Sequence, residues 1–288
     1  MGVWFRRLEP IKPVFLRLKM THNNKPSNKH QTQDTDQYLA RKNFFDHMIT
    51  LYGRKPVIEV LKDPKLEIYK LHLAKSNRES SIIKELRDLA ERRQIEVVLH
   101  SREQLSRISR NSKQDQGVAC DIYCPGFQPY AKFLADNNAN NNVKTSLIAL
   151  DSVTNPQNLG MIIRSVTASP ATGILLPSKG SAALSPLVIK ASAGTAFKGN
   201  ILSCDNLEKA LIDFKQRGFK ICTLSSHQST PITEFETEHP CIFVLGNETH
   251  GVQQSIIDIS DYRIGIPMAN GVESLNVAVT AALVAFKL

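Results

Sequence analysis

The sequence predicts an α/β protein of two domains, the larger of which holds a mostly parallel sheet with helices on both faces. Two observations predict this class. Strand-like and helix-like segments alternate from residue 145 onward, and the strand-like segments are short continuous apolar runs such as SLIAL and CIFVL. The length of 288 residues leaves room for a second domain, at the usual ~100–200 residues per domain.

The first 46 residues lack apolar periodicity. The stretch THNNKPSNKHQTQDTDQ is polar, and Pro10 and Pro13 would interrupt an amphipathic helix in the more apolar part before it. We therefore expect residues 1–46 to form a disordered basic arm. A targeting peptide is the alternative for its first part, although the Ser residues typical of such peptides are missing there.

Residues 47–125 alternate between strand and helix patterns and predict a small α/β domain. The patterns place a turn and short helix over 51–63, strands over 66–74, 95–100 and 117–123, and helices over 82–94 and 101–109. Ser101 stands where an N-cap is expected.

A linker is predicted over residues 126–144. The run of Asn residues within it offers nothing from which a core could be built, and the charge balance of the chain changes at this point.

The remaining residues, 145–288, predict the larger domain. Strands are expected over 146–151, 173–177, 200–204, 219–226, 241–248 and 262–267, and helices over 158–169, 185–197, 206–218 and 253–260. The last segment, IPMANGVESLNVAVTAALVAF, passes through a turn and then becomes an apolar helix.

Charge and cysteine usage bound the function. The net charge is +9, and all of the excess lies before residue 126, which favours a polyanionic partner such as nucleic acid. The five scattered Cys residues form no metal-binding or disulfide pattern, so we expect no metal and a reducing, cytoplasmic location. No apolar run reaches the ~18 residues of a membrane span.

The common cofactor signatures are missing from the sequence. It has no GxGxxG after a first strand, no Walker A sequence, no HExxH and no GxSxG. A nucleotide-dependent oxidoreductase therefore lacks the glycine pattern that it needs. Sites in parallel sheets still form beyond the carboxyl ends of strands, and three such ends carry unusual polar residues.

The first strand end leads into NPQNLGMIIRS, with Asn158 in the first turn of a helix and Arg164 among apolar neighbours. The alternative for Arg164 is a guanidinium that reaches solvent from the helix edge. The second strand end is LGNETHG, where Glu248 either caps the next helix or serves a site.

The third strand end is the start of the last segment, with Ser274 and Asn276 before the apolar helix. Ser274 is a candidate N-cap. Asn276 is harder to explain locally, because a buried amide without partners costs roughly 1–3 kcal/mol. Its amide is therefore expected to pair with backbone, with another loop or with a substrate.

Together and in this order, NPQNLGMIIRS, LGNETHG and IPMANGVESLNVAVTAA resemble the SpoU (TrmH-type) RNA ribose 2′-O-methyltransferases of the SPOUT superfamily. GRKPVIEVL and DQGVAC also look like the small substrate-binding domain of many members. The resemblance implies a SPOUT-type sheet with a C-terminal trefoil knot, S-adenosyl-L-methionine as cofactor, an RNA substrate and a homodimer.

The resemblance also implies roles for individual residues. The cofactor-binding residues would be Leu245, Gly246, Asn247, Ile266, Met268 and Leu275, and the catalytic residues Asn158, Arg164, Glu248, Ser274 and Asn276. One departure is Ala278, where many relatives have Ser, at a position that is not usually catalytic.

The substrate expected from the resemblance is structured RNA, with 23S-type rRNA preferred because the added N-terminal domain resembles that of rRNA-modifying relatives. The alternatives are tRNA 2′-O-methylation and a non-catalytic RNA-binding homologue. The presence of all five expected catalytic residues argues against the second.

Overall fold

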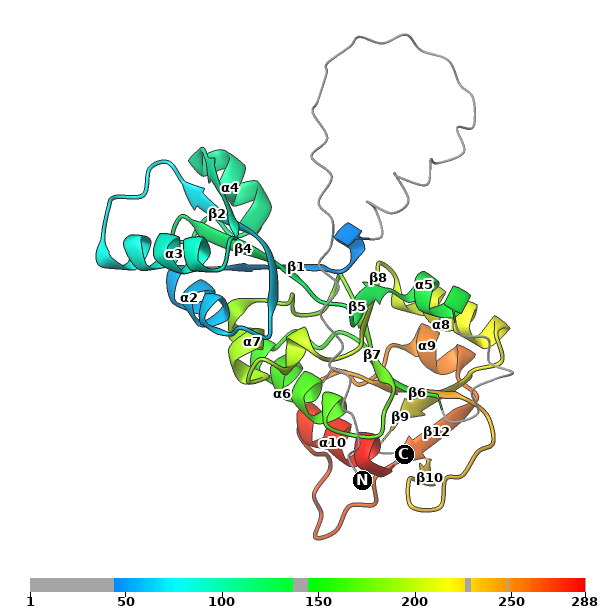
Figure 1. Ribbon diagram of the computed structural model, residues 1–288. Helices are drawn as coiled ribbons and strands as arrows, with labels where there is room; N and C mark the ends of the chain where they lie inside the picture. Colours follow the sequence, from blue (N-terminus) through cyan, green and yellow to red (C-terminus); the bar gives the residue numbers. More distant parts are fainter. Residues whose placement is uncertain (1–43, 137–144, 226–228, 248, 288) are drawn as a thin grey trace, which may run out of the picture.

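The computed structural model describes residues 44–136, 145–225, 229–247 and 249–287, which form two α/β domains (Figure 1). Most of the predicted arm, residues 1–43, lies outside the described residues. So does Glu248, one of the predicted catalytic residues. No helix among the described residues is long and apolar enough to cross a membrane.

The small domain has a mixed four-stranded sheet in the order β1-β4-β2-β3. β4 is antiparallel to β1 and β2, whereas β2 and β3 are parallel. The strands are β1 (Met48–Tyr52), β2 (Glu67–Ala74), β3 (Glu96–His100) and β4 (Val118–Tyr123), and the helices are α2 (Arg54–Lys62), α3 (Ser81–Arg92) and α4 (Arg102–Ser109).

Two local expectations in this domain have definite outcomes. Ser101 caps α4 as predicted, and it forms a capping box with Gln104. The turn and short helix expected over 51–63 are present as a bend at Gly53 and α2, but the turn begins later than expected, because β1 runs through Tyr52. β1 is recognisable only once it pairs with β4, which joins Met48 to Tyr123 and Tyr52 to Ala119.

The predicted linker is partly folded. β5 (Phe127–Pro129) pairs with β8 at the edge of the larger sheet, and α5 (Tyr130–Asp136) follows it directly. Phe133 and Leu134 are buried against α8 and its neighbours. These apolar side chains make residues 127–136 part of the larger domain, while 137–144 lie outside the described residues.

The larger sheet has eight strands in the order β10-β12-β9-β11-β6-β7-β8-β5, and every neighbouring pair is parallel. The remaining strands are β6 (Ser146–Leu150), β7 (Gly173–Pro177), β8 (Ile201–Cys204), β9 (Lys220–Leu224), β10 (Thr230–Pro231), β11 (Cys241–Leu245) and β12 (Tyr262–Gly265). The predicted α/β class with a mostly parallel sheet is confirmed, and the trefoil knot stays a prediction.

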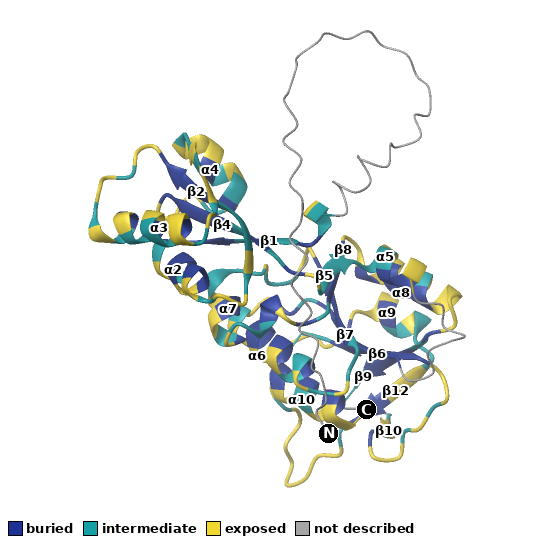
Figure 2. Ribbon diagram, viewed as in Figure 1, coloured by how far each residue is buried: buried dark blue, intermediate teal, exposed yellow. Residues whose placement is uncertain are grey.

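Helices cover both faces of this sheet (Figures 1 and 2). One layer holds α6 (Pro156–Thr167), α7 (Pro186–Ala191), the 3₁₀ helix η2 (Thr195–Phe197) and α10 (Val277–Lys287), and the other holds α5, α8 (Leu207–Gln216) and α9 (Gln254–Ile259). In β6, Leu147 and Ala149 pack into the α8 layer, and Ile148 and Leu150 into the α6 layer. Burial on both faces explains why the strands read as unbroken apolar runs.

Gly160 sets the contact between α6 and α7. A Cβ at this position would collide with the side chain of Ala191 and with the Val188 carbonyl oxygen. The missing side chain lets the two helices approach closely, which fixes α6 and therefore the two polar residues that it carries, Asn158 and Arg164.

Candidate active site

A cavity of about 1090 Å³ opens beyond the carboxyl ends of β9, β11 and β12. Its walls come from the segments that follow these strands and from the start of α10. We call it the C-terminal cavity. All six residues expected to bind the cofactor line it, namely Leu245, Gly246, Asn247, Ile266, Met268 and Leu275. Ser274 and Asn276, two of the residues expected to be catalytic, line it as well.

The turn after β11 forms one wall and depends on glycine. The backbones of Asn247 and Gly251 exchange two hydrogen bonds, with N–O distances of 3.0 and 2.9 Å. A Cβ on Gly246 would collide with the Gly251 backbone, and Gly251 itself has φ +68°. The backbone turns back tightly here, so its polar groups lie at the cavity wall with little side chain in front of them.

Asp151 stabilises this turn through hydrogen bonds to Gln253, a role that was not predicted from the sequence. Its carboxylate is buried and accepts hydrogen bonds from the Gln253 backbone N–H at 2.7 Å and from Gln253 Nε2 at 2.6 Å. Asn247 Nδ2 also donates to the Ser152 carbonyl oxygen at 3.0 Å. The only signal in the sequence was a carboxylate at the end of an apolar strand.

Asn276, rather than Ser274, caps α10. Its Oδ1 accepts a hydrogen bond from the Ala278 backbone N–H at 2.9 Å, and its carbonyl oxygen accepts the first helical bond, from Thr280. The helix begins at Val277. The expectation that Ser274 would be the N-cap is therefore wrong, because the helix starts three residues after it, and Ser274 is exposed in the cavity wall.

The amide of Asn276 has a second role, which connects two of the predicted motifs. Its Nδ2 donates to Oδ1 of Asn158 at 3.2 Å. Asn158 is buried in the first turn of α6, which Asn155 caps through hydrogen bonds from the N–H groups of Gln157 and Asn158. Asn276 is exposed rather than buried as expected, but the expected partner exists. The bond brings together two predicted catalytic residues that are 118 positions apart in the chain.

Arg164 lies apart from this group. It is exposed on α6 and does not line the C-terminal cavity. Close to it in the helix is Met161, which is 42% exposed, and α10 packs against α6. Of the predicted catalytic residues, the structure therefore groups Asn158, Ser274 and Asn276, and it leaves Arg164 on the surface.

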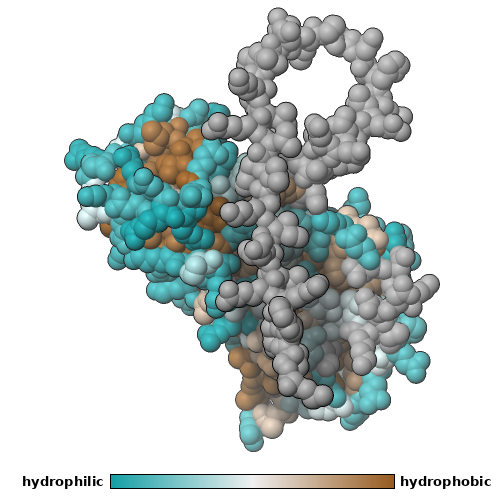
Figure 3. Space-filling view, in the orientation of Figure 1, coloured by the Kyte–Doolittle hydropathy of each residue, from teal (hydrophilic) through white to brown (hydrophobic). Residues whose placement is uncertain are grey.

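The helix α10, which packs against α6, also carries exposed apolar side chains. On α10, three side chains at helical spacing are exposed, namely Val279 (48%), Leu283 (46%) and Phe286 (57%). Figure 3 shows hydrophobic residues gathered at this place in the fold. We call Met161 and these three residues the α6–α10 surface.

The cavity wall combines apolar side chains with hydroxyl and amide groups. Among the described residues that line it, Glu273 is the one carboxylate, and none is Lys or Arg. The described part of the chain contains no cluster of His, Cys, Asp or Glu that could hold a metal ion. Such a wall can hold a planar or aliphatic group and bind its polar edges through backbone and amide groups.

Comparisons with known proteins agree with this geometry. The model of the SpoU rRNA methylase family matches residues 145–286, and that of the RNA 2′-O ribose methyltransferase substrate-binding domain matches residues 50–123. A protein of Mycolicibacterium gilvum, named an uncharacterized tRNA/rRNA methyltransferase, is 29% identical over 90% of this chain and 82% of its own. A protein of the same name from Mycolicibacterium smegmatis is 30% identical over 83% of this chain and 75% of its own.

Solved structures share the fold. The crystal structure of an AdoMet-bound rRNA methyltransferase from Sinorhizobium meliloti superposes with a TM-score of 0.55 at 22% identity, and the match covers 88% of this chain and 90% of that one. Sequence relatives, family models and fold point the same way. The chain belongs to the SpoU rRNA methylase family.

Proposed function

We propose that this protein transfers a methyl group from S-adenosyl-L-methionine to a ribose 2′-hydroxyl of RNA, and that 23S-type rRNA is its substrate. The observation that carries the proposal is the C-terminal cavity. It gathers the six residues expected to bind the cofactor with Ser274 and Asn276, and Asn276 is hydrogen-bonded to Asn158 on the neighbouring helix.

The residues of the cavity fit this cofactor. Gly246 lines the cavity in a backbone turn that packs directly against Gly251, and Leu245, Ile266 and Met268 offer apolar contacts for an adenine ring. None of the described lining residues is a Lys or Arg that would repel a sulfonium group. When bound, the cofactor supplies an electrophilic methyl group.

The side chains of this chain would position the nucleophile. A ribose 2′-hydroxyl is a poor nucleophile, and its attack depends on alignment and on stabilisation of the developing negative charge. Asn276 lines the cavity and is held by its hydrogen bond to the buried Asn158, so it would orient the ribose there. Arginine side chains carry a planar cationic fork that suits phosphate binding, so Arg164 would bind the adjacent phosphate and would not act as a general base.

The position of Arg164 supports a homodimer in which the site is shared. Arg164 does not line the cavity of its own chain, and it lies beside the apolar α6–α10 surface. A second copy packed on this surface would bury the apolar side chains and bring each Arg164 toward the cavity of the partner. Two-fold symmetric contacts of this kind are the commonest among homo-oligomers.

The preference for rRNA over tRNA rests on the resemblance of the small domain to that of rRNA-modifying relatives. The substrate-binding model that the domain matches names RNA without distinguishing the two. Methylation of tRNA is the alternative substrate, and a non-catalytic RNA-binding protein is the alternative function. A reducing, cytoplasmic setting accords with the five Cys residues, all of which are free and buried.

Methyl transfer tests the proposal directly. Purified protein is incubated with labelled S-adenosyl-L-methionine and, separately, with bulk rRNA and bulk tRNA. Label in rRNA at an alkali-resistant ribose supports the proposal, and mapping ribose methylation in cells with and without the protein identifies the nucleotide. Label confined to tRNA would replace the substrate, and cofactor binding without transfer to any RNA would favour the non-catalytic alternative.

A further inference from the structure

A second large hollow lies between the two domains. This interdomain cleft has a volume of about 1050 Å³, and none of the residues that line it belongs to the C-terminal cavity. The small domain contributes residues from 52–56 and 111–116, and the larger domain contributes Thr154, Pro156 and the segment 182–187. Among its described lining residues, two are cations and none is a carboxylate.

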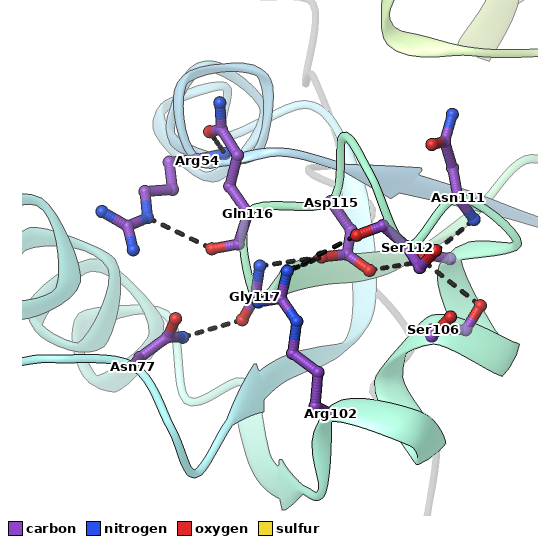
Figure 4. Close-up of polar contacts among 10 residues, drawn as sticks. Arg54, Asn77, Arg102, Ser106, Asn111, Ser112, Asp115, Gln116 and Gly117 are labelled. Atoms are coloured by element: carbon purple, nitrogen blue, oxygen red, sulfur yellow. Dashed lines mark hydrogen bonds and ion pairs between the residues drawn. The ribbon is translucent and has the colours of Figure 1, made fainter.

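The loop between α4 and β4 forms much of the small-domain wall and is built around a buried carboxylate (Figure 4). Asp115 is 1% exposed and accepts hydrogen bonds from Ser109 Oγ and from the Gly117 backbone N–H, each at 2.9 Å. Asn111 Nδ2 donates to the hydroxyl of Tyr52 at 2.9 Å. The Asp115 carboxylate is thus hydrogen-bonded inside the loop and does not line the cleft. The loop residues that do line the cleft, Asn111, Gln114 and Gln116, have amide side chains.

The two cations of the cleft are the first two residues of α2. Gln116 fixes Arg54, because its Oε1 accepts from the Arg54 backbone N–H at 3.1 Å and its carbonyl oxygen accepts from Arg54 Nε at 3.2 Å (Figure 4). Lys55 is exposed. The helix carries no acidic residue in its first turn, so its dipole adds to the positive potential of the two side chains.

The wall of the larger domain connects the cleft to the candidate active site. Pro156 lines the cleft at the start of α6, and Asn158 is in the same helical turn. With a rise of about 1.5 Å per residue, the two positions are separated by roughly 3 Å along the helix axis. Asn158 in turn binds Asn276 at the C-terminal cavity. The first turn of α6 thus contacts the interdomain cleft through Pro156 and the wall of the C-terminal cavity through Asn158.

We infer that the interdomain cleft binds a single-stranded segment of the substrate RNA next to the methylated nucleotide. This inference rests on the proposed function. Arg54 and Lys55 contact phosphates. Asn111 Nδ2 and the Oε1 atoms of Gln114 and Gln116 are used within the protein, so Asn111 Oδ1 offers an acceptor and the Nε2 groups of Gln114 and Gln116 offer donors to base edges. Single strands expose these edges, whereas an A-form duplex hides them in a narrow major groove. The site thus extends beyond the small domain and uses both domains as walls.

Binding of a labelled single-stranded RNA of mixed sequence to the full-length protein tests the inference. Each phosphate contact on a single strand contributes about 0.7 to the slope of log affinity against log salt concentration. The double variant Arg54→Ala/Lys55→Ala should therefore lower the magnitude of this slope by about 1.4. The matched control Lys65→Ala/Arg92→Ala removes the same charge from exposed positions of the same domain outside the cleft, and its slope should equal that of the unmodified protein.

Photo-crosslinking from the two walls locates the RNA. Gln114 and Ala183 are both exposed and lie on opposite walls of the cleft. A photoreactive residue at either position should crosslink to the RNA, and excess unlabelled single strand should compete better than a duplex of the same sequence. Crosslinking from Gln114 alone, a slope unchanged in the double variant, or equal competition by the duplex would overturn the inference.

The binding assay contains no cofactor, so its result is separable from that of the proposed function. S-adenosyl-L-methionine binding and methyl transfer are measured on the same proteins. The double variant should bind the cofactor like the unmodified protein and transfer methyl groups more slowly at limiting RNA. If the unmodified protein neither binds the cofactor nor transfers a methyl group, the proposed function fails while the RNA-binding result still stands.

Discussion

At the scale of single residues, the side chain of Asn276 forms two hydrogen bonds with different roles, and a substitution such as Asn276→Ala would remove both at once. Its Oδ1 caps α10, and its Nδ2 donates to Asn158. Loss of an N-cap typically costs about 0.5–2 kcal/mol of stability. The link to Asn158 belongs to the site, because it ties the wall of the C-terminal cavity to the first turn of α6.

Asn276→Asp separates the two tasks. Aspartate caps helices as well as Asn does, but its carboxylate cannot donate to Asn158 Oδ1. We expect the thermal midpoint of this variant to match the unmodified protein and methyl transfer to fall sharply. Asn276→Ala should lose both transfer and stability. Normal turnover in Asn276→Asp would reduce Asn276 to a helix cap.

A second polar group lies in the small domain, far from the cavity. Asp121 accepts hydrogen bonds from Thr50 Oγ1 at 2.6 Å and contacts His72 Nε2 at 3.0 Å, while His72 Nδ1 is 2.9 Å from His100 Nε2. Burial alone would raise the pKa of Asp121, but these hydrogen bonds hold the pKa below its usual value. Burial and the neighbouring His72 lower the pKa of His100.

The sign of both shifts predicts acid sensitivity of the small domain. A lowered Asp121 pKa means that the carboxylate stabilises the fold above its unfolded pKa of about 3.9. This contribution is lost as the pH falls through the lowered pKa. The pKa of His100 is lower in the folded protein than in the unfolded chain, where it is about 6.5, so the fold already begins to lose stability as the pH falls below about 6.5.

Asp121→Asn should therefore lower the free energy of unfolding near pH 7 by about 1–3 kcal/mol and flatten its decline below about pH 3.9, where protonation of the carboxylate would otherwise remove its contribution. Urea unfolding at several pH values measures this. Glu79→Gln, at a carboxylate that is 65% exposed, is the control and should change neither quantity.

At the scale of elements, the sequence predicted the buried strands and their helices well, because burial on both faces makes each strand of the larger sheet an unbroken apolar run. It missed β1 and β5, because neither segment has a recognisable strand pattern on its own. Each is recognised as a strand only by its pairing, β1 with β4 and β5 with β8. It located the cavity residues through the resemblance. It could not show that Asn276 pairs with Asn158 or that Asp151 holds the turn after β11, since these contacts join distant segments.

The faces of α6 predict different roles for its two polar residues. Asn158 is buried and faces α10, whereas Arg164 is exposed. Arg164→Ala removes no buried group, so we expect the protein to keep its thermal midpoint and its affinity for S-adenosyl-L-methionine while methyl transfer is lost. Arg164→Lys keeps the charge but not the planar fork that binds phosphate bidentately, and should recover only part of the rate. Near-normal turnover in Arg164→Ala would remove Arg164 from the mechanism.

At the scale of the whole molecule, the α6–α10 surface predicts association. Val279, Leu283 and Phe286 form one exposed stripe on α10, and contiguous exposed apolar patches mark interaction sites. Leu283→Glu should convert a dimer into a monomer of normal fold, seen as a halved mass in light scattering. Ile212→Glu is the control, because Ile212 is an exposed apolar residue on α8, in the opposite helix layer. A dimer that survives Leu283→Glu would place the interface elsewhere.

Mixing two inactive variants tests whether the active site is shared between subunits. Arg164→Ala keeps an intact cavity, and Asn276→Asp keeps an intact Arg164. If Arg164 acts in the cavity of the partner, a mixed dimer contains one complete site, formed by the cavity of the first subunit and the arginine of the second. Random reassociation makes half of the dimers mixed, so about a quarter of the unmodified activity should return in a symmetric two-site dimer. If Arg164 serves its own chain, every site in the mixture carries one defect and the activity stays at the level of the separate variants.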